Sequence, residues 1–189
     1  MLNILIAGVG GQGTLLASRV LGKYALDSGF DCKLSEVHGM AQRGGSVITY
    51  VRISQNADEK IYSPIIDEGG ADIVLAFEKL EALRYMPYLK KDGIVLYSSQ
   101  EILPMPVVTG EREYPRGIES ELGGTAVNAL DLAVQAGNAK AANSVMLGAF
   151  CKVLGLDKEK FSAALLSCIP QKTVELNKKA FESGYNAVK

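Results

Sequence analysis

The chain has 189 residues, enough for one domain that buries roughly 70% of its unfolded surface in a single core. Its 20 Lys and Arg residues balance 21 Asp and Glu residues, so no strong field attracts nucleic acid or an anionic membrane. No apolar run approaches the ~20 residues of a membrane-spanning helix, and a strand rather than a charged leader starts the chain. We therefore expect a cytoplasmic protein whose partners include no nucleic acid and no membrane.

The cysteines Cys32, Cys151 and Cys168 are widely separated in the sequence. Because an iron–sulfur cluster needs grouped thiolates, we expect none on this chain alone. His38 is the single histidine, which argues against a His-rich metal site. No G-x-S-x-G motif or Cys–His pairing points to a nucleophile, so we assign no catalytic residue and no metal ligand.

The N-terminal stretch predicts a buried strand over residues 2–7, a glycine-rich turn, and a helix that begins at Thr14. Gly8, Gly10 and Gly13 fit the G-x-G-x-x-G spacing. Glycines permit positive φ angles and close approach to the main chain, while the helix dipole favours an anion at this position. The turn is therefore suited to contact with another molecule.

Three interpretations of this turn stay open. A dinucleotide is the first, and Glu36 follows the second strand about where a ribose-binding acid would lie, ~20 residues further on. The second is that the glycines serve only a tight corner between strand and helix. The third is a non-nicotinamide ligand or a protein surface that closes on the turn. The additional glycine Gly11 and the long amide of Gln12 argue against an ordinary NAD site.

Residues 31–37 predict a second strand, which completes a βαβ unit. Residues 46–53 predict a β-branched strand that can run antiparallel, because the preceding loop is too short for a crossover helix. That loop, residues 38–46, is rich in glycine and polar groups. It follows the carboxyl end of a strand, which is where ligands bind in open α/β sheets.

Further along, residues 71–77 predict a central parallel strand and residues 93–98 the next strand, with a helix over residues 78–86 between them. A short helix is expected after Pro64. Prolines in the stretch 102–117 predict extended segments at an edge instead of a helix.

The C-terminal part is predicted to be helical. We expect a helix over residues 125–136, a longer one capped by Asn138 and reaching Gly155, another capped by Asp157, and an amphipathic helix over residues 172–183. Gly148 costs ~1 kcal/mol relative to alanine within a helix, so it predicts a close backbone contact, either in helix–sheet packing within the domain or between subunits.

The alternation of strands and helices predicts an α/β fold. We expect a three-layer α/β/α domain with a mostly parallel, Rossmann-like sheet and a helical C-terminal part. Residues 1–189 would form this single domain.

Two glycine segments together resemble the signature of the gamma-type domain of 2-oxoacid:ferredoxin oxidoreductases. They are residues 8–13, Gly-Val-Gly-Gly-Gln-Gly, and residues 36–47, which contain His-Gly-Met-Ala-Gln-Arg-Gly-Gly. The second segment most resembles the beta subunit of indolepyruvate ferredoxin oxidoreductase. Residues 135–138 and 142–149 are similar to the C-terminal helical motif of that family. The resemblance therefore spans essentially the whole chain.

The resemblance implies a subunit that is not active alone. The complete enzymes oxidatively decarboxylate a 2-oxoacid, an aryl pyruvate in the indolepyruvate branch, to an acyl-CoA with ferredoxin as electron acceptor. A large alpha-type partner would carry thiamine diphosphate, Mg and the iron–sulfur clusters, with coenzyme A as co-substrate, and ferredoxin would meet the complex. This chain has neither the Gly-Asp-Gly thiamine motif nor ferredoxin-like cysteine runs, which agrees with that division.

Several alternatives stay open beside this assignment. One is the gamma subunit of a pyruvate or 2-oxoglutarate ferredoxin oxidoreductase, and another is a free-standing NAD(P)-binding reductase. A third is a pure scaffold that holds a complex together without contributing to its cleft. The sequence also leaves open whether the isolated chain forms a homodimer.

We expect the two glycine loops to form one wall of a cleft that closes over the partner's active site or the coenzyme A channel. Arg43 would supply a fixed cation for a phosphate or carboxylate, with the amide of Gln12 beside it, unless Arg43 pairs with Glu36 within the fold. His38 has no evident orienting carboxylate, so a structural hydrogen bond is favoured over acid–base catalysis. The expected binding residues are Gly10, Gly11, Gln12, Gly13, Gln42, Arg43, Gly44 and Gly45.

Overall fold

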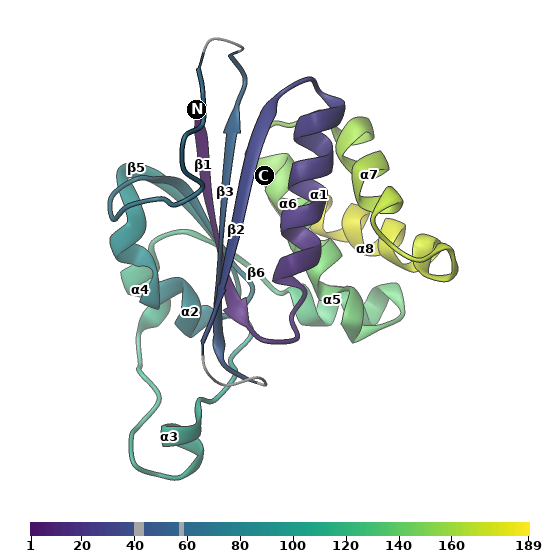
Figure 1. Cartoon of the computed structure of the whole chain (residues 1–189). Helices are drawn as coiled ribbons and strands as arrows, with labels where there is room; N and C mark the ends of the chain where they lie inside the picture. The colour runs from purple at the N-terminus through teal and green to yellow at the C-terminus, as the bar shows by residue number, and fades with distance from the viewer. Residues whose placement is uncertain (40–43, 57–58) are drawn as a thin grey trace.

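The computed structural model describes residues 1–39, 44–56 and 59–189, which fold around a mixed sheet (Figure 1). In these residues the sheet has six strands in the order β2-β3-β1-β4-β5-β6. Strands β1, β4, β5 and β6 run parallel, and β3 is antiparallel to both of its neighbours. The expectation of a mostly parallel sheet is confirmed. The strands are β1 (Leu2–Val9), β2 (Asp31–His38), β3 (Ser46–Ser54), β4 (Ala71–Ala76), β5 (Leu89–Ser98) and β6 (Thr125–Val127).

Helices cover both faces of the sheet, which confirms the three-layer arrangement (Figure 1). The thicker layer contains α1 (Thr14–Asp27), α5 (Ala129–Ala136), η2 (Ala139–Ala141), α6 (Ala142–Val153), α7 (Lys158–Ser167), η3 (Gln171–Thr173) and α8 (Val174–Ala187). The thinner layer contains α2 (Lys79–Arg84), η1 (Met86–Tyr88) and α4 (Ile118–Leu122), while the short α3 (Met105–Val108) projects from one rim.

The alternation of side chains along β1 explains why both faces are covered. Ile4 and Ile6 enter the core beneath the thicker helical layer, whereas Leu5 and Ala7 enter the core beneath α2 and α4. All four side chains are fully buried. A strand that is apolar on both faces is typical of the centre of a parallel sheet.

Strand β3 lies between β1 and β2. Val51 of β3 is opposite Ile4 of β1 on one side and Leu34 of β2 on the other. The expected unit of β1, α1 and β2 is therefore present, but an antiparallel strand separates its two parallel strands. This insertion places β2 at the edge of the sheet.

Two predictions about the segments between strands were wrong, and a third misplaced the start of a helix, as described in the next paragraph. No helix follows Pro64: residues 61–66 have no regular secondary structure, and the Arg52 guanidinium donates hydrogen bonds to the carbonyls of Ser63 (2.9 Å) and Ile65 (3.4 Å). The proline-rich stretch does contain a helix, α3, since proline is tolerated in the first helical turn, where the N–H has no intrahelical partner.

The predicted helix over residues 125–136 begins later than expected. Its first part is the strand β6, which pairs with the end of β5. A Cβ at Gly124 would lie 2.4 Å from the carbonyl oxygen of Val95, so the missing side chain lets the two backbones approach. The helix α5 then starts after Asn128, whose side chain accepts a hydrogen bond from the Asp131 amide.

The predicted close contact at Gly148 is confirmed and lies inside the domain. A Cβ at this position would lie 2.0 Å from the carbonyl oxygen of Phe181, and one at Gly184 would lie 1.8 Å from that of Val145. The contact partner is the helix α8, whereas the expectation was the sheet. The predicted cap at Asp157 is also confirmed. Asn138 does act as a cap, but of the 3₁₀ turn η2 that precedes α6, whereas α6 itself starts after Ala141 without a side-chain cap.

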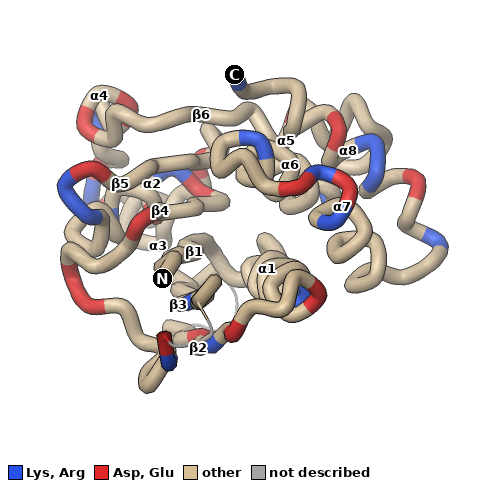
Figure 2. Tube along the Cα trace, turned by 90° about the horizontal axis from the view of Figure 1, so that it is seen from above, with Lys and Arg blue, Asp and Glu red and all other residues tan. Residues whose placement is uncertain are grey.

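Basic and acidic residues are interspersed along the chain trace (Figure 2). This distribution agrees with the balanced composition. Within the described residues, no helix combines the length and the apolar character needed to cross a bilayer.

Candidate functional site

The two glycine loops meet at the rim formed by the carboxyl end of β1. The Gly10 amide donates a hydrogen bond to the carbonyl oxygen of Gly45 over 2.9 Å. A Cβ at Gly10 would lie 3.7 Å from the Gly44 amide nitrogen, so the two backbones are close neighbours. The pairing of β1 with β3 reaches this rim, with Val9 opposite Ser46. The predicted convergence of the loops is therefore confirmed.

Gln42 and Arg43 lie outside the described residues. Their expected roles, including the alternative in which Arg43 pairs with Glu36, stay predictions. The described flanks of the loop are anchored on both sides: the Gly39 amide donates to the carbonyl oxygen of Ser46 over 3.0 Å, and the Ser46 hydroxyl bonds the carboxylate of Glu81 and lies 3.0 Å from the hydroxyl of Tyr85.

The turn itself needs glycine at two positions. Gly11 and Gly13 have φ angles of 102° and 88°, a region that side chains disfavour. A Cβ at Gly13 would also lie 2.4 Å from Nδ2 of Asn143. By contrast, a Cβ at Gly11 would meet nothing within 4 Å. The main chain at Gly11 is thus open to another molecule.

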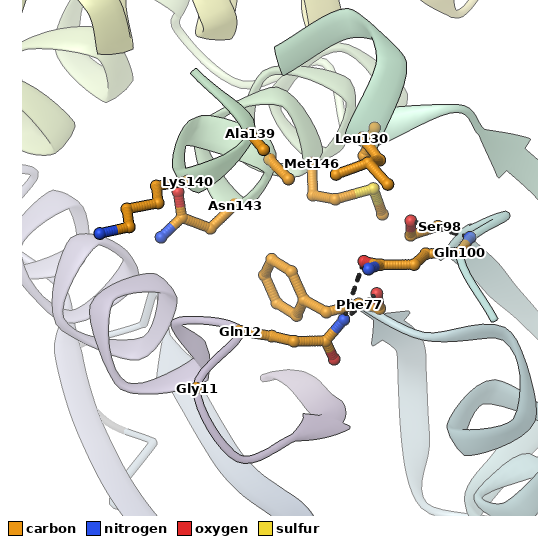
Figure 3. A pocket seen from close by; sticks show the side chains of 12 residues that line it. Gly11, Gln12, Phe77, Ser98, Gln100, Leu130, Ala139, Lys140, Asn143 and Met146 are labelled. Atoms are coloured by element: carbon orange, nitrogen blue, oxygen red, sulfur yellow. Dashed lines mark hydrogen bonds between the residues drawn. The ribbon is translucent and has the colours of Figure 1, made fainter. Parts of the chain in front are cut away.

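Gln12 ties three strand ends together. Its Oε1 accepts a hydrogen bond from the Val9 amide (2.8 Å), while its Nε2 donates to the carbonyl oxygen of Phe77 (2.9 Å) and to Oε1 of Gln100 (3.1 Å) (Figure 3). These partners follow or end β1, β4 and β5. Nε2 of Gln12 thus makes two hydrogen bonds within the chain, and the expected role of this amide as a donor beside Arg43 stays a prediction.

A cavity of about 270 Å³ lies beside Gln12 and is called the rim cavity here. The side chains of Phe77, Met146 and Leu130 give it an apolar lining, and Gln100 and Asn143 add amides (Figure 3). Its full lining is Gly11, Gln12, Phe77, Ser98, Gln100, Ala129, Leu130, Ala139, Lys140, Ala142, Asn143 and Met146.

The position of the rim cavity is typical of ligand sites in open α/β sheets. It adjoins the carboxyl ends of β1, β4 and β5. Here α1, which follows β1, and α2, which follows β4, pack on opposite faces of the sheet. Lys140 lies at this cavity, and none of the ion pairs found among the described residues includes it. A cation beside amide donors can hold a carboxylate or phosphate group.

The residues from α5 to α6 that line this cavity were not expected to be part of the site. Gln100 could have been found from the rule that strands present ligand-binding groups just beyond their carboxyl ends. Lys140 and Asn143 carry no such local signal, because only the packing of the C-terminal helices brings them to the glycine turn.

His38 does have an orienting carboxylate, contrary to the expectation. Its Nε2 lies 2.6 Å from Oε1 of Glu36, and the Thr49 hydroxyl donates to the other carboxylate oxygen of Glu36 over 3.0 Å. His38 and Glu36 are two residues apart on one strand, so they share a face of the sheet. The side chain of His38 is 64% exposed, whereas that of Glu36 is 14% exposed. The favoured structural hydrogen bond is thus present.

The placement of Glu36 argues against the dinucleotide interpretation. In dinucleotide-binding folds the ribose-binding acid ends the strand next to the glycine-rich one. Here β3 lies between β1 and β2, so Glu36 is displaced by one further strand spacing, about 4.8 Å. Its carboxylate is also engaged by Thr49 and His38.

The fold and the site place this chain among the open α/β domains that present a ligand or partner site at the carboxyl edge of a mostly parallel sheet. The chain belongs to the pyruvate ferredoxin/flavodoxin oxidoreductase family, whose profile matches residues 3–187.

Known proteins resemble the chain over nearly all of its length. It is 42% identical over 197 residues to the indolepyruvate oxidoreductase subunit IorB of Thermococcus kodakarensis, covering 99% of this chain and 96% of the relative. The gamma subunit of a keto/oxoacid ferredoxin oxidoreductase from Geobacter sulfurreducens has a TM-score of 0.74 at 30% identity, covering 99% of this chain and 98% of that one.

A further relative contains this domain within a longer chain. The ketoisovalerate oxidoreductase subunit VorA of Methanothermobacter marburgensis is 30% identical over 186 residues, which are 96% of this chain and 35% of the relative. The family therefore includes the domain both as a separate subunit and as one part of a larger polypeptide.

Proposed function

We propose that this chain is the subunit of an indolepyruvate-type ferredoxin oxidoreductase that carries no redox cofactor of its own. The observation that carries the proposal is the 42% identity to an indolepyruvate oxidoreductase subunit along the whole chain. Identity falls to 30% for the ketoisovalerate subunit, which favours the aryl pyruvate branch. The reaction would convert an aryl pyruvate and coenzyme A to an acyl-CoA and CO₂, with ferredoxin as electron acceptor.

We assign thiamine diphosphate, Mg and the iron–sulfur clusters to a large partner subunit. The described part of this chain contains no group of three His, Cys, Asp or Glu side chains placed to ligate a metal ion. When bound to the partner, thiamine diphosphate supplies the carbanion chemistry of decarboxylation. The contribution of this chain is a rim of backbone donors, apolar side chains and amides that closes over that centre or the coenzyme A channel.

Reconstitution tests the assignment. The chain and its large partner are purified separately and together, and reduction of ferredoxin is followed with indolepyruvate, pyruvate and 2-oxoglutarate. We expect turnover only when both chains and coenzyme A are present, with indolepyruvate preferred in kcat/KM. A preference for pyruvate or 2-oxoglutarate would move the chain to another branch of the family.

Arg43 is the residue that we propose to hold the phosphate or carboxylate group. Arg43→Ala should lower kcat/KM of the complex about 10- to 100-fold, the effect of losing a charge-assisted hydrogen bond. The matched control is Arg19→Ala, which removes an exposed cation from α1 and should leave turnover unchanged. An unaltered rate and coenzyme A dependence in the Arg43 variant would reject this role.

The rival function, a free-standing NAD(P)-dependent reductase, makes a different prediction. It requires saturable stabilisation of the isolated chain by a dinucleotide, measured as a thermal shift. We expect no such shift, because β3 separates Glu36 from the glycine turn.

A further inference from the structure

A projecting segment between β5 and α4, residues 99–117, is called the arm here. It leaves the same rim as the glycine loops and carries α3 at its far end (Figure 1). None of the residues of α3 is buried. Leu103, Met105 and Val108 expose 51%, 70% and 61% of their surfaces. Apolar side chains gathered on one exposed segment are typical of a protein interaction surface.

The base of the arm is held by a buried carboxylate. Glu78 is 1% exposed and caps α2 by accepting a hydrogen bond from the Glu81 amide over 2.7 Å. Its other oxygen accepts from the Ile102 amide (3.0 Å) and the Tyr114 hydroxyl (3.3 Å). The Glu78 side chain thus holds the arm on both sides of α3, at Ile102 before it and at Tyr114 after it.

A buried lysine adds a second attachment. The side chain of Lys79 is 8% exposed, and its ammonium group pairs with Glu101 at the start of the arm and with Glu119 just after its end. A buried charge is tolerated when it is paired with an opposite charge. The two ion pairs of Lys79 therefore hold both ends of the arm next to α2. The exposed end of the arm is therefore presented on a rigid support, although no described segment covers it.

The base of the arm is also continuous with the rim cavity. Gln100 accepts a hydrogen bond from Gln12 through its side chain and one from the Lys79 amide (3.0 Å) through its main-chain carbonyl. It also lines the cavity. A molecule seated on the arm would lie beside the glycine turn and the opening of the rim cavity.

We propose that the arm is the docking element for the large partner subunit, with Leu103, Met105 and Val108 as its contact residues. This inference rests on the proposed function, because that function requires the cofactor centre of another polypeptide to reach this rim. A second copy of the chain would bring no such centre to the rim. The relative in which the domain is 35% of the polypeptide shows that members of the family join this fold to further protein.

The test uses the complex reconstituted from the full chain and its large subunit. Met105→Asp combined with Val108→Asp places two charges on the exposed face of α3 and should weaken assembly at least 10-fold, measured by titration and size-exclusion chromatography. The control is Leu26→Asp, which places a charge at the C-terminal end of α1, away from the rim, where Leu26 is 66% exposed. This variant should assemble like the wild type. Far-UV circular dichroism and thermal melting of each isolated variant should match the wild type, since α3 contributes nothing to the core.

Two outcomes would overturn the docking inference and leave the proposed function intact. One is that the arm variant assembles with the affinity of the wild type in an active complex. The other is that the arm variant dissociates a dimer of the isolated chain while the complex with the large subunit stays intact, which would make a second copy the occupant. If the wild-type chain forms no active complex with the large subunit, the proposed function and the docking inference both fail.

Discussion

Gln12 performs an unusual task for a residue at the tip of a glycine-rich turn. Its amide bonds the Val9 amide, the carbonyl of Phe77 and the side chain of Gln100, so three parallel strand ends are connected by one side chain. A small or apolar residue at this position could not make these bonds. The geometry of the turn is therefore coupled to that of the neighbouring strand ends.

Gln12→Glu should test this coupling, because it keeps the size of the side chain and replaces the donor by a carboxylate. We expect a loss of about 2 kcal/mol in the free energy of unfolding, since the Phe77 carbonyl loses its donor. For a domain of this size that loss corresponds to a fall of about 4–8 °C in Tm. Gln135→Glu, at an exposed position in α5, is the control. Equal melting temperatures for the two variants would show that the hydrogen bonds of Gln12 do not stabilise the fold.

Cys151 should make stability depend on pH. It is fully buried, and burial raises the pKa of its thiol from 9.0 to about 11. Because the folded pKa is the higher one, the unfolded chain releases this proton first as the pH rises, and stability is lost above pH 9 by at most about 1.4 kcal/mol per pH unit. Urea titrations from pH 7.5 to 10.5 should show a steeper decline for the wild type than for Cys151→Ala. Parallel declines would contradict the prediction.

At the scale of elements, α6 and α8 cross where Gly148 and Gly184 let their backbones touch. A Cβ at Gly148 would lie 2.0 Å from the carbonyl oxygen of Phe181, and a backbone atom cannot move aside as a side chain can. Gly148→Ala should therefore destabilise the fold by about 3 kcal/mol or more, measured by denaturant unfolding. Gly22→Ala in α1 is the matched control, since its Cβ would meet only the end of Leu34, at 3.2 Å. A Gly148 variant as stable as this control would exclude a tight crossing.

Glu78 links α2 to the arm, so its removal should affect both elements. Glu78→Gln replaces one accepting oxygen by a donor and should cost about 1–2 kcal/mol, as the loss of a helix cap does. It should also speed tryptic cleavage at Arg112 and Arg116, because the base of the arm loosens. Glu121→Gln, an exposed change of the same charge in α4, serves as the control. Cleavage at the rate of the control would refute the anchoring role of Glu78.

For the whole molecule, the sequence predicted well what depends on local patterns. The strand, turn and helix at the N-terminus follow from apolar periodicity and glycine spacing, and the caps at Asn138 and Asp157 follow from side-chain chemistry. The pairing of His38 with Glu36 was also accessible, because residues two apart on a strand share a face.

Features that depend on distant packing could not be predicted from the sequence. Strand β6 exists because Gly124 lets its backbone approach Val95, and sequence periodicity carries no sign of that contact. The cavity forms because α6 delivers Asn143 to Gly13, which lies far away in the chain. Likewise, β3 pairs with both β1 and β2 and lies between them. The sequence of a single strand does not specify which neighbours it pairs with.

In the proposed complex, the rim that carries the glycine loops, the rim cavity and the arm faces the large subunit. Hydrogen–deuterium exchange of the chain, alone and in the reconstituted complex, will show which end of the molecule is covered. We expect slower exchange in the complex for residues 9–14, 44–47 and 99–117, with no change for residues 27–31 and 153–158 at the C-terminal ends of α1 and α6. Protection confined to the C-terminal ends of these two helices would contradict this arrangement.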